Sequence, residues 1–187
     1  MGELIYITPM SLDGFLADES GSPEWSAPDE EVHSFINDRE RPFGTHIYGR
    51  KMYETMAVWE TMDLDEQPSA VADYAEIWRA AEKIVFSKTL ETVTTARTTL
   101  KRDFDPVEIA RMKETAGRDL AIGGPHLAAT AIRAGLVDEY QLFVVPAMIG
   151  KGNTVLPTDV QIDLELVDEK RFDSGWVYLR YRPATPR

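Results

Sequence analysis

Three short segments of the sequence carry the residue types that bind phosphate groups. Each segment comes directly after an apolar run, and the residues concerned are Gly49, Arg50 and Lys51, then Ser87 and Lys88, then Gly123 and Gly124. Glycines let backbone amides approach a ligand closely, cations neutralise its charge, and the free N–H groups at the start of a helix favour an anion. The chemistry that these segments suggest is the binding of a phosphorylated ligand.

Each segment also has a simpler interpretation. A glycine after a strand is most often a turn residue, and cations at the start of a helix are most often solvated. For Gly123 and Gly124 a turn and a phosphate site are equally supported, and no segment matches the G-x-G-x-x-G or Walker pattern. The conjunction favours a ligand, because the chain has a net charge of −12 and cations gathered in so acidic a protein need an explanation.

One carboxylate lies in a chiefly apolar stretch, MSLDGFLAD. Asp13, followed by Gly14, is either part of a tight turn or bulge, or an acid at the mouth of a pocket. In the second case it holds an amine-bearing substrate or relays a proton. The acids at 29–31 are expected to begin a helix, where the macrodipole favours them. Asp13 is therefore the candidate catalytic residue.

Alternating strands and helices must position these candidates. Short apolar or alternating runs predict strands, spacing near 3.6 residues predicts helices, and a Thr-rich stretch is β-prone. The expected strands cover residues 3–8, 45–48, 83–86, 92–100, 120–122 and 138–146, and the expected helices cover residues 28–38, 52–59, 69–81, 106–115 and 125–134. Residues 162–172 and 176–181 are expected to form a terminal antiparallel hairpin.

This order of elements predicts an α/β three-layer sandwich. Its sheet is mixed and mainly parallel, with helices on both faces and the antiparallel hairpin at one edge. We find no repeat or linker, so residues 1–187 are expected to form a single domain. Because the carboxyl ends of parallel strands lie along one edge of a sheet, the three phosphate-compatible segments are expected to face one crevice.

Composition excludes several classes of protein. The acidic balance disfavours a nucleic-acid partner, and no apolar run approaches the ~20 residues of a membrane span. The chain has no cysteine, and its three histidines lie far apart in sequence, so neither a disulfide nor a metal site is expected. The N-terminus lacks the basic region of a secretory signal, so we expect a cytoplasmic location.

Five motifs spread over nearly the whole chain resemble the dihydrofolate reductase superfamily. They are MSLDGFLAD, YGRKMYETM, IVFSKT, DLAIGGPHLAATAIRAGLVDEYQLFVVPAMIGKG and FDSGWVYLRY. More closely, they resemble stand-alone relatives of the reductase domain of the riboflavin-biosynthesis deaminase-reductase. Each motif alone is weak, but together they are specific, and they imply a dihydrofolate reductase-like fold.

The resemblance also implies a cofactor, NADPH, and a set of contacts to it. These contacts are Gly49, Arg50 and Lys51 at the phosphates, Ser87 and Lys88 at the adenosine 2′-phosphate, and Ile122, Gly123, Gly124, His126 and Leu127 at the pyrophosphate and nicotinamide ribose. Asp13 matches an acid on the substrate side. Related reductases are commonly homodimers packed through C-terminal strands, which here implies the region around residues 142–146.

Two departures from the pattern narrow the expected function. Without cysteine or the H-x-E…P-C-x-x-C pattern the chain has no deaminase domain. No acid within 29–37 aligns uniquely with the catalytic Asp of dihydrofolate reductase. We therefore expect an NADPH-dependent reductase that transfers a hydride to a C=N or C=O bond of a small heterocyclic substrate. A dihydrofolate reductase and a non-catalytic NADP(H)-binding protein on the same fold are the alternatives.

Overall fold

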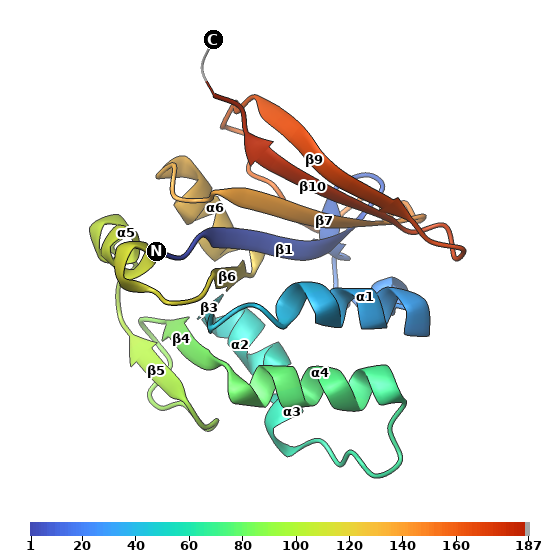
Figure 1. Cartoon of the computed structure of the whole chain (residues 1–187), viewed down its shortest axis with the longest axis horizontal. Helices are drawn as coiled ribbons and strands as arrows, with labels where there is room; N and C mark the ends of the chain where they lie inside the picture. Colours follow the sequence, from blue (N-terminus) through green and yellow to red (C-terminus); the bar gives the residue numbers. More distant parts are fainter. Residues whose placement is uncertain (186–187) are drawn as a thin grey trace.

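A twisted eight-stranded sheet forms the centre of the protein in a computed structural model that describes residues 1–185 (Figure 1). The strands are β1 (Leu4–Ser11), β2 (Phe15–Ala17), β3 (Thr45–Gly49), β4 (Glu82–Phe86), β5 (Thr98–Lys101), β6 (Leu120–Gly123), β7 (Glu139–Val145), β8 (Asn153–Thr154), β9 (Leu164–Arg171) and β10 (Val177–Pro183). The helices are η1 (Glu24–Ser26), α1 (Glu30–Glu40), α2 (Arg50–Met56), α3 (Val58–Thr61), α4 (Ser69–Ala80), α5 (Pro106–Thr115) and α6 (Pro125–Arg133).

The strand order in the sheet is β5-β4-β3-β6-β1-β7-β10-β9. The strands from β5 to β7 in that order all run parallel to their neighbours. The hairpin of β9 and β10 then adds to β7 in the antiparallel sense. Strands β2 and β8 pair separately as a small second sheet. The predicted mixed, mainly parallel sheet with a terminal antiparallel hairpin is confirmed.

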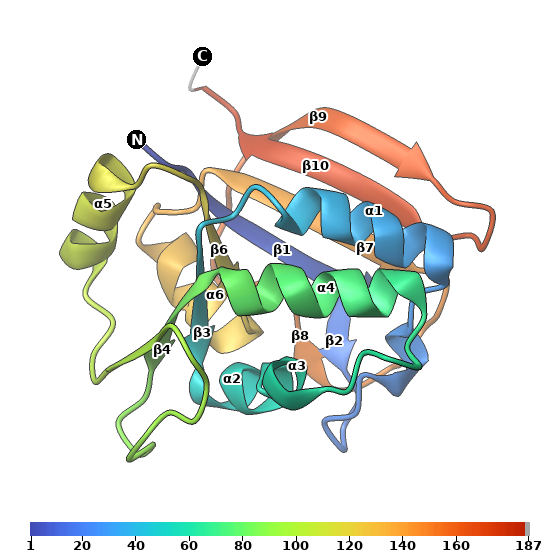
Figure 2. The ribbon, with the colours of Figure 1, turned by 60° about the horizontal axis from the view of Figure 1, so that its bottom comes forward.

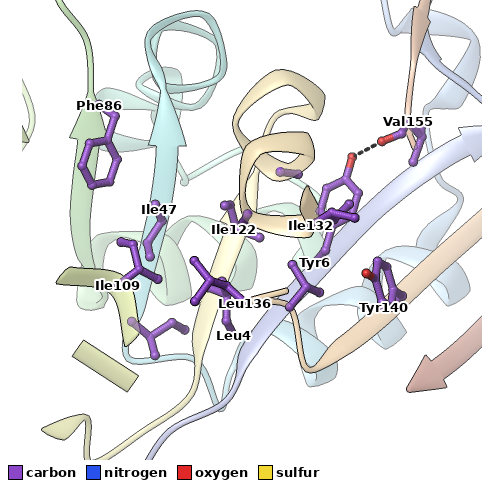
Figure 3. Close-up of a cluster of buried hydrophobic side chains, with 14 of the residues drawn as sticks. Leu4, Tyr6, Ile47, Phe86, Ile109, Ile122, Ile132, Leu136, Tyr140 and Val155 are labelled. Atoms are coloured by element: carbon purple, nitrogen blue, oxygen red, sulfur yellow. Dashed lines mark hydrogen bonds between the residues drawn. The ribbon is translucent and has the colours of Figure 1, made fainter. Parts of the chain in front are cut away.

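Helices cover both faces of the sheet, because successive side chains of each strand point to opposite sides. Leu4 and Tyr6 of β1 pack with α5 and α6 in the larger core cluster, which Figure 3 shows. Ile5 and Ile7 of the same strand point to the other face. There α1 and α4 lie side by side across the sheet (Figure 2). The result is the three-layer sandwich that the sequence predicts.

Local signals in the sequence fix where the helices begin and end. Asp29 caps α1 by accepting a hydrogen bond from the backbone N–H of Val32 at 2.8 Å. Asp105 caps α5 in the same way, ahead of Pro106 at the first helical position. Gly135, with φ of 66°, follows the C-cap of α6. These positions agree with the helices expected over 28–38, 106–115 and 125–134.

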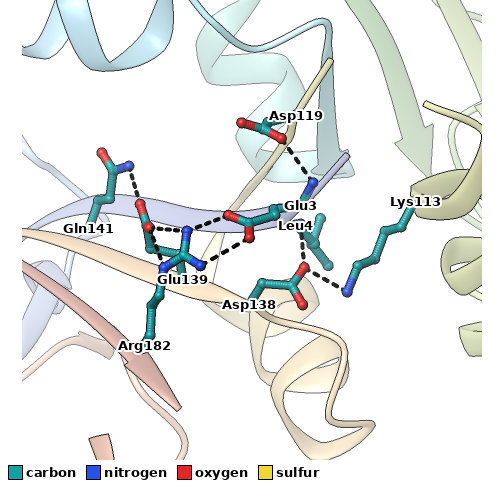
Figure 4. A network of polar contacts seen from close by, with 8 residues as sticks. All are labelled: Glu3, Leu4, Lys113, Asp119, Asp138, Glu139, Gln141 and Arg182. Carbon is teal, nitrogen blue, oxygen red and sulfur yellow. Dashed lines mark hydrogen bonds and ion pairs between the residues drawn. The ribbon is translucent and has the colours of Figure 1, made fainter. Parts of the chain in front are cut away.

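A polar network closes the edge of the sheet at the amino ends of its parallel strands (Figure 4). Arg182 on β10 binds Glu3 at 2.6 Å and the buried carboxylate of Glu139 at 3.0 Å. Asp138 accepts a hydrogen bond from the backbone N–H of Leu4 and pairs with Lys113 at 2.6 Å. The protein's own ion pairs therefore occupy the amino ends of these strands.

Two expectations need correction. The β-prone stretch 92–100 forms a strand only at 98–101, because residues 91–97 are turn and loop. The helix expected over 52–59 begins earlier, at Arg50, and breaks at Ala57 into α2 and α3. The implied dimer contact around 142–146 stays a prediction; β7, to which most of these residues belong, lies between β1 and β10 in the sheet.

Candidate functional site

The three predicted segments lie side by side at the carboxyl edge of the sheet. Their strands β4, β3 and β6 are consecutive neighbours, with Gly49 opposite Phe86 and Tyr48 opposite Gly123. In an open parallel sheet this edge is where ligands bind. The three strand ends are neighbours, as the prediction of a single crevice requires. The binding role of each residue stays a prediction.

Gly123 and Gly124 are required by packing and backbone geometry. A Cβ on Gly123 would lie 2.8 Å from Cε1 of Tyr48, and one on Gly124 would lie 3.1 Å from Cβ of Met52. Gly124 also has φ of 89°, a conformation that other residues rarely adopt. Gly123 is the last residue of β6, so the turn interpretation fits Gly124 alone. It is compatible with a ligand because the turn leads directly into α6.

The N-terminus of α6 has no side-chain cap. Gly124 is its N-cap and Pro125, which lacks an N–H, is its first residue. Within residues 1–185 the N–H groups of His126 and Leu127 have no hydrogen-bond acceptor, as expected for the first turn of an uncapped helix. Two free donors and the helix dipole therefore point out of the carboxyl edge, which is the arrangement that binds an anion.

The two residues after Pro125 face opposite flanks of α6. Cβ of Leu127 lies 3.9 Å from where a Cβ on Gly49 would be, so its side chain sits between α6 and the end of β3. His126 is exposed and lines a hollow of about 170 Å³ between α6 and residues 154–158. Ile122 is fully buried in the core, so it can contribute only backbone to a ligand.

The cations of the first segment differ in how far their charge is neutralised. Arg50 follows the N-cap Gly49, and its Nε lies 2.7 Å from Oε1 of Glu54. Its Nη1 also donates to Oγ1 of Thr89 at 3.0 Å, which links α2 to the loop after β4. Lys51 is exposed and has no ion-pair partner within the part of the chain that the structure describes.

The second segment folds as a tight turn over residues 87–90, here called the 87–90 turn. Oγ of Ser87 accepts hydrogen bonds from the backbone N–H groups of Thr89 and Leu90 at 3.2 and 2.9 Å. Lys88 points to solvent and pairs with Asp103 at 3.2 Å. The Ser87 side chain therefore shapes the turn, and an acid already compensates the Lys88 charge.

Sequence reasoning missed Arg102 at this edge. Its Nη1 donates to the backbone carbonyls of Ser87 and Leu90, at 3.1 and 2.5 Å, and so holds the 87–90 turn from the side of β5. The signal was available, because a Lys-Arg pair directly follows the β-prone stretch that ends in β5. Arg102 directly follows β5, just as Arg50 directly follows β3.

Asp13 is the acid that joins two loops. Its carboxylate accepts hydrogen bonds from Oγ of Ser11 at 2.6 Å, from the N–H of Ile149 at 3.1 Å and from the N–H of Gly150 at 2.7 Å. Chiefly the Ser11 hydrogen bond lowers the pKa of Asp13 below its usual value. Asp13 is therefore ionised at neutral pH, and both lone-pair regions of its carboxylate face donors within the protein.

This contact forms part of a wider connection between the loops after β1 and β7. The N–H of Leu12 donates to the carbonyl of Ala147 at 2.8 Å, and the N–H of Val155 donates to that of Gly14 at 2.9 Å. An open hollow of about 540 Å³ lies beside the connection, lined by Asp18, Glu19, Ser20, Ile149, Gly150 and Lys151. The two loops thus form the wall of the carboxyl edge on the side of β1 and β7.

The largest pKa shifts with resolved values belong to a buried pair on another part of the sheet. Burial raises the pKa of Glu40, at the end of α1, to about 8 and lowers that of His46, at the start of β3, to about 3. Their side chains approach to 3.7 Å beneath the α1 and α4 layer. Both groups lie toward the amino end of β3, so neither marks a proton donor at the carboxyl edge.

Residues 1–185 contain neither a group of three or more His, Cys, Asp and Glu side chains that could hold a metal ion nor a helix long and apolar enough to cross a membrane.

Comparison with known proteins gives a family match and consistent structural neighbours. The model of the RibD C-terminal domain matches residues 3–178. A curated relative from Bacillus subtilis strain 168, the uncharacterized protein YyaP, is 28% identical over 177 residues, which is 92% of this chain and 90% of the relative.

Among solved structures, a Shewanella sp. PV-4 protein named for riboflavin biosynthesis has a TM-score of 0.76 at 18% identity, covering 99% of this chain and 100% of its own. A deaminase and 5-amino-6-(5-phosphoribosylamino)uracil reductase from Thermotoga maritima has a TM-score of 0.67 at 17% identity, covering 98% of this chain and 57% of its own. Enterococcus faecalis dihydrofolate reductase, complexed with NADP(H) and RAB-propyl, has a TM-score of 0.68 at 15% identity and covers 98% of each chain. At these identities the neighbours show the fold.

Proposed function

Since the chain belongs to the RibD C-terminal domain family, we propose that it is an NADPH-dependent reductase. In this proposal it transfers a hydride to a C=N or C=O bond of a small heterocyclic substrate, as in a 5-amino-6-(5-phosphoribosylamino)uracil reductase. The uracil reductase activity named for the Thermotoga maritima protein and the NADP(H) bound to the Enterococcus faecalis protein are the comparisons that support it.

One structural observation carries the proposal. The uncapped N-terminus of α6, the Gly49 segment and the 87–90 turn are neighbours along one edge of the sheet. A dinucleotide with several phosphates needs such a row of separate donors, whereas a single phosphate needs only one of them. The geometry therefore favours an extended phosphorylated cofactor over a small anion.

Each segment has a definite part in the proposed binding of NADPH. The free N–H groups after Gly124 would receive the pyrophosphate, Arg50 and Lys51 would face phosphate oxygens, and the 87–90 turn would lie at the adenosine end. Bound NADPH supplies the hydride, and the chain supplies position and charge. Among the residues of this chain, those of α6 and of the loops after β1 and β7 would enclose the reacting end.

Asp13 is proposed to orient the substrate side of the site. Because its pKa is lowered, it holds no proton to deliver at neutral pH, and of the two roles considered for it the orienting one fits better. Its hydrogen bonds to Ile149 and Gly150 place these residues at the wall of the 540 Å³ hollow. It would act through the loop that it holds.

Oxidation of NADPH in the presence of candidate substrates tests the proposed reaction. Purified protein is incubated with NADPH and either 5-amino-6-(5-phosphoribosylamino)uracil or dihydrofolate, and the loss of reduced nicotinamide absorbance is followed. We expect turnover with the uracil derivative or a related heterocycle. Turnover with dihydrofolate that methotrexate inhibits would favour the dihydrofolate reductase alternative instead. NADPH binding without turnover on any such compound would favour the non-catalytic alternative.

We also propose that the protein is a homodimer in solution. One of the two edge strands of the sheet is β9, where Leu164, Leu166 and Val167 are 38%, 47% and 44% exposed. An edge strand with unpaired backbone groups and exposed apolar side chains is a surface that pairs readily with another chain. The region around 142–146 that the resemblance implies lies two strands away from β9 in the same sheet.

A further inference from the structure

The second half of α1 packs against the hairpin of β9 and β10 through aromatic rings (Figure 2). The ring of Phe35 lies 5.3 Å from that of Phe172 and 5.0 Å from that of Tyr178, edge to face in both cases. One turn further along α1, the guanidinium of Arg39 lies over the Phe35 ring, with Cζ 5.0 Å from its centre. This contact, here called the α1–hairpin junction, therefore brings a cation of α1 to the buried side chain of Tyr178.

The register of the sheet brings a second cation to the α1–hairpin junction. Arg180 on β10 lies opposite Gln141 on β7 and Asp168 on β9. Tyr178 precedes Arg180 by two residues on the same strand, so both side chains point to the face that α1 covers. Burial raises the pKa of Tyr178 to about 12, although the guanidiniums of Arg39 and Arg180 act in the opposite direction. The hydroxyl therefore keeps its proton at neutral pH and lies close to two cations.

Four polar atoms at this junction are buried and have no hydrogen-bond partner among the described residues. They are Nε of Arg39, Oη of Tyr178, Nε of Arg180 and Oε1 of Gln141. The side chains of Tyr178 and Gln141 are deeply buried, since these residues are 0% and 5% exposed. Buried polar atoms in proteins nearly always have a partner. Four unpaired ones in one place indicate a ligand that supplies the partners.

The donors among these atoms suit an oxyanion. Arg39 and Arg180 each offer guanidinium N–H groups, and Tyr178 offers its hydroxyl proton. Within residues 1–185 no carboxylate lies at ion-pair distance from Arg39, and the acid nearest Arg180 is Asp168, at 3.9 Å. Guanidinium groups bind the oxygens of phosphates and carboxylates through charge-assisted hydrogen bonds. Two of them beside a hydroxyl therefore form a set of donors for such a group.

Gln141 restricts which oxyanion fits. Its Nε2 donates to Oε1 of Glu139 at 2.7 Å, and Figure 4 shows its carbonyl oxygen pointing away from that carboxylate. This oxygen can only accept a hydrogen bond, so the ligand must carry a proton. Inorganic phosphate keeps at least one proton at neutral pH, whereas sulfate has none and a phosphate monoester loses its last one near pH ~6. Of these three anions, inorganic phosphate fits the junction best.

We propose that the α1–hairpin junction is a binding site for inorganic phosphate. Arg39, Arg180 and Tyr178 donate to phosphate oxygens, and the remaining phosphate proton is donated to Gln141. Gln141 lies near the amino end of β7, whereas the proposed cofactor segments follow the carboxyl ends of β4, β3 and β6. The phosphate site is therefore separate from the proposed cofactor site and does not rest on the proposed function.

Calorimetric titration of inorganic phosphate into the full chain tests the proposal, at constant ionic strength in a buffer without phosphate. We expect saturable binding to the wild type. Sulfate and glycerol phosphate are expected to bind at least roughly 10-fold more weakly, because neither reliably brings a proton to Gln141. Arg39→Gln and Arg180→Gln are each expected to raise the Kd for phosphate roughly 10- to 100-fold, since each removes a charge-assisted contact.

Two control variants separate this site from other sources of attraction. Arg111→Gln, at an exposed position on α5, makes the same change in net charge. Arg50→Gln makes that change at the proposed cofactor site. Both are expected to bind phosphate within about 3-fold of the wild type.

The Tyr178→Phe variant separates binding from structure, because it keeps the aromatic packing and removes only the hydroxyl. It is expected to raise the Kd for phosphate roughly 3- to 10-fold. Without phosphate its thermal unfolding should match that of the wild type, since the hydroxyl has no partner there to lose. A hydroxyl with a merely structural role would lower the unfolding temperature without phosphate and leave the Kd unchanged. Thermal unfolding also confirms that every variant is folded.

Three results would overturn the proposal. They are a wild type without saturable phosphate binding at millimolar concentration, a Kd that Arg39→Gln, Arg180→Gln and Tyr178→Phe all leave unchanged, and a loss of binding in Arg50→Gln alone. Sulfate bound as tightly as phosphate would overturn the part assigned to Gln141. Each of these results leaves the proposed reductase function standing, because that function is tested by NADPH.

Discussion

Single residues at the carboxyl edge serve the fold and the proposed site together. Gly124 allows the sharp entry into α6 because its φ is 89°, and a Cβ there would lie only 3.1 Å from Cβ of Met52. The same entry leaves the first N–H groups of α6 without a cap. The choice between a turn and a ligand site, which the sequence left open, is thus not exclusive: the turn is what exposes the donors.

The Gly124→Ala variant tests whether the fold requires a glycine at this position. A residue with a Cβ at this φ costs roughly 1–3 kcal/mol of stability. Gly117→Ala is the matched control, because Gly117 has no atom near the position of a Cβ and no positive φ. Urea unfolding should show a clear loss for Gly124→Ala and little change for Gly117→Ala, and equal stability of the two variants would contradict the structure.

The lowered pKa of Asp13 predicts how the loop around Ile149 and Gly150 responds to pH. A carboxylate with a lowered pKa stabilises the folded state above the ordinary pKa of Asp, and this contribution is lost as the pH falls through the folded-state pKa. The protection factors of the Ile149 and Gly150 amides, which correct for the slower intrinsic exchange in acid, should therefore be high at neutral pH and fall as the pH drops through the folded-state pKa of Asp13.

The Asp13→Asn variant should show fast exchange of these amides at neutral pH. The Asn side chain has one oxygen to accept hydrogen bonds from the three donors, whereas the Asp carboxylate has two. Ser11→Ala leaves the carboxylate in place and should retain most of the protection. Equal exchange in wild type and Asp13→Asn would show that Asp13 does not hold the loop.

At the scale of elements, residues 146–160 form a long segment that is tied to the sheet and helices at separate points. Tyr6 on β1 donates its hydroxyl to the carbonyl of Val155 at 3.0 Å, and Arg133 on α6 pairs with Asp159 at 2.9 Å. Both residues come from elements that also position the carboxyl edge. The segment therefore depends on the same framework as the proposed site.

The Tyr6→Phe variant tests how much the buried hydrogen bond from Tyr6 to Val155 contributes to stability. It removes one donor and leaves the Val155 carbonyl without a partner in a buried environment, which costs roughly 1–3 kcal/mol. Tyr181→Phe is the control, because no hydrogen bond from that hydroxyl to the described residues is present. The difference in the free energy of unfolding between the two variants measures the contribution of the Tyr6–Val155 hydrogen bond to stability. A difference near zero would show that this hydrogen bond does not stabilise the fold.

Much of this element pattern was predictable because it depends on local sequence. Apolar periodicity located the central strands, and Asp29, Asp105 and Gly135 marked helix ends through short-range geometry. The partners of Asp13 were not predictable, since Ile149 lies 136 residues away in sequence. The partners of Arg102 were not predictable either, since the carbonyls of Ser87 and Leu90 that it binds lie 15 and 12 residues away in sequence.

At the scale of the whole molecule, the two edges of the sheet have different characters. The β5 edge carries the cations around the 87–90 turn, and the β9 edge carries exposed apolar side chains. The proposed cofactor site and the proposed dimer contact therefore do not compete for the same surface.

The Leu166→Asp variant tests the dimer. Leu166 is 47% exposed in the single chain, so the substitution should leave the monomer folded while placing a charge in the contact. Size-exclusion chromatography with light scattering should report a dimer for wild type and a monomer for the variant. A monomeric wild type, or a variant that remains dimeric, would contradict the placement of the contact on β9.

The binding of NADPH to the wild-type chain tests the central claim most directly. NADPH is titrated into the protein, and nicotinamide fluorescence reports the bound fraction. The row of phosphate donors formed by the Gly49 segment, the 87–90 turn and the start of α6 predicts saturable binding well below millimolar concentration, with NADPH bound more tightly than NADH. Absence of binding of either dinucleotide below millimolar concentration would contradict the assignment of this edge as a cofactor site.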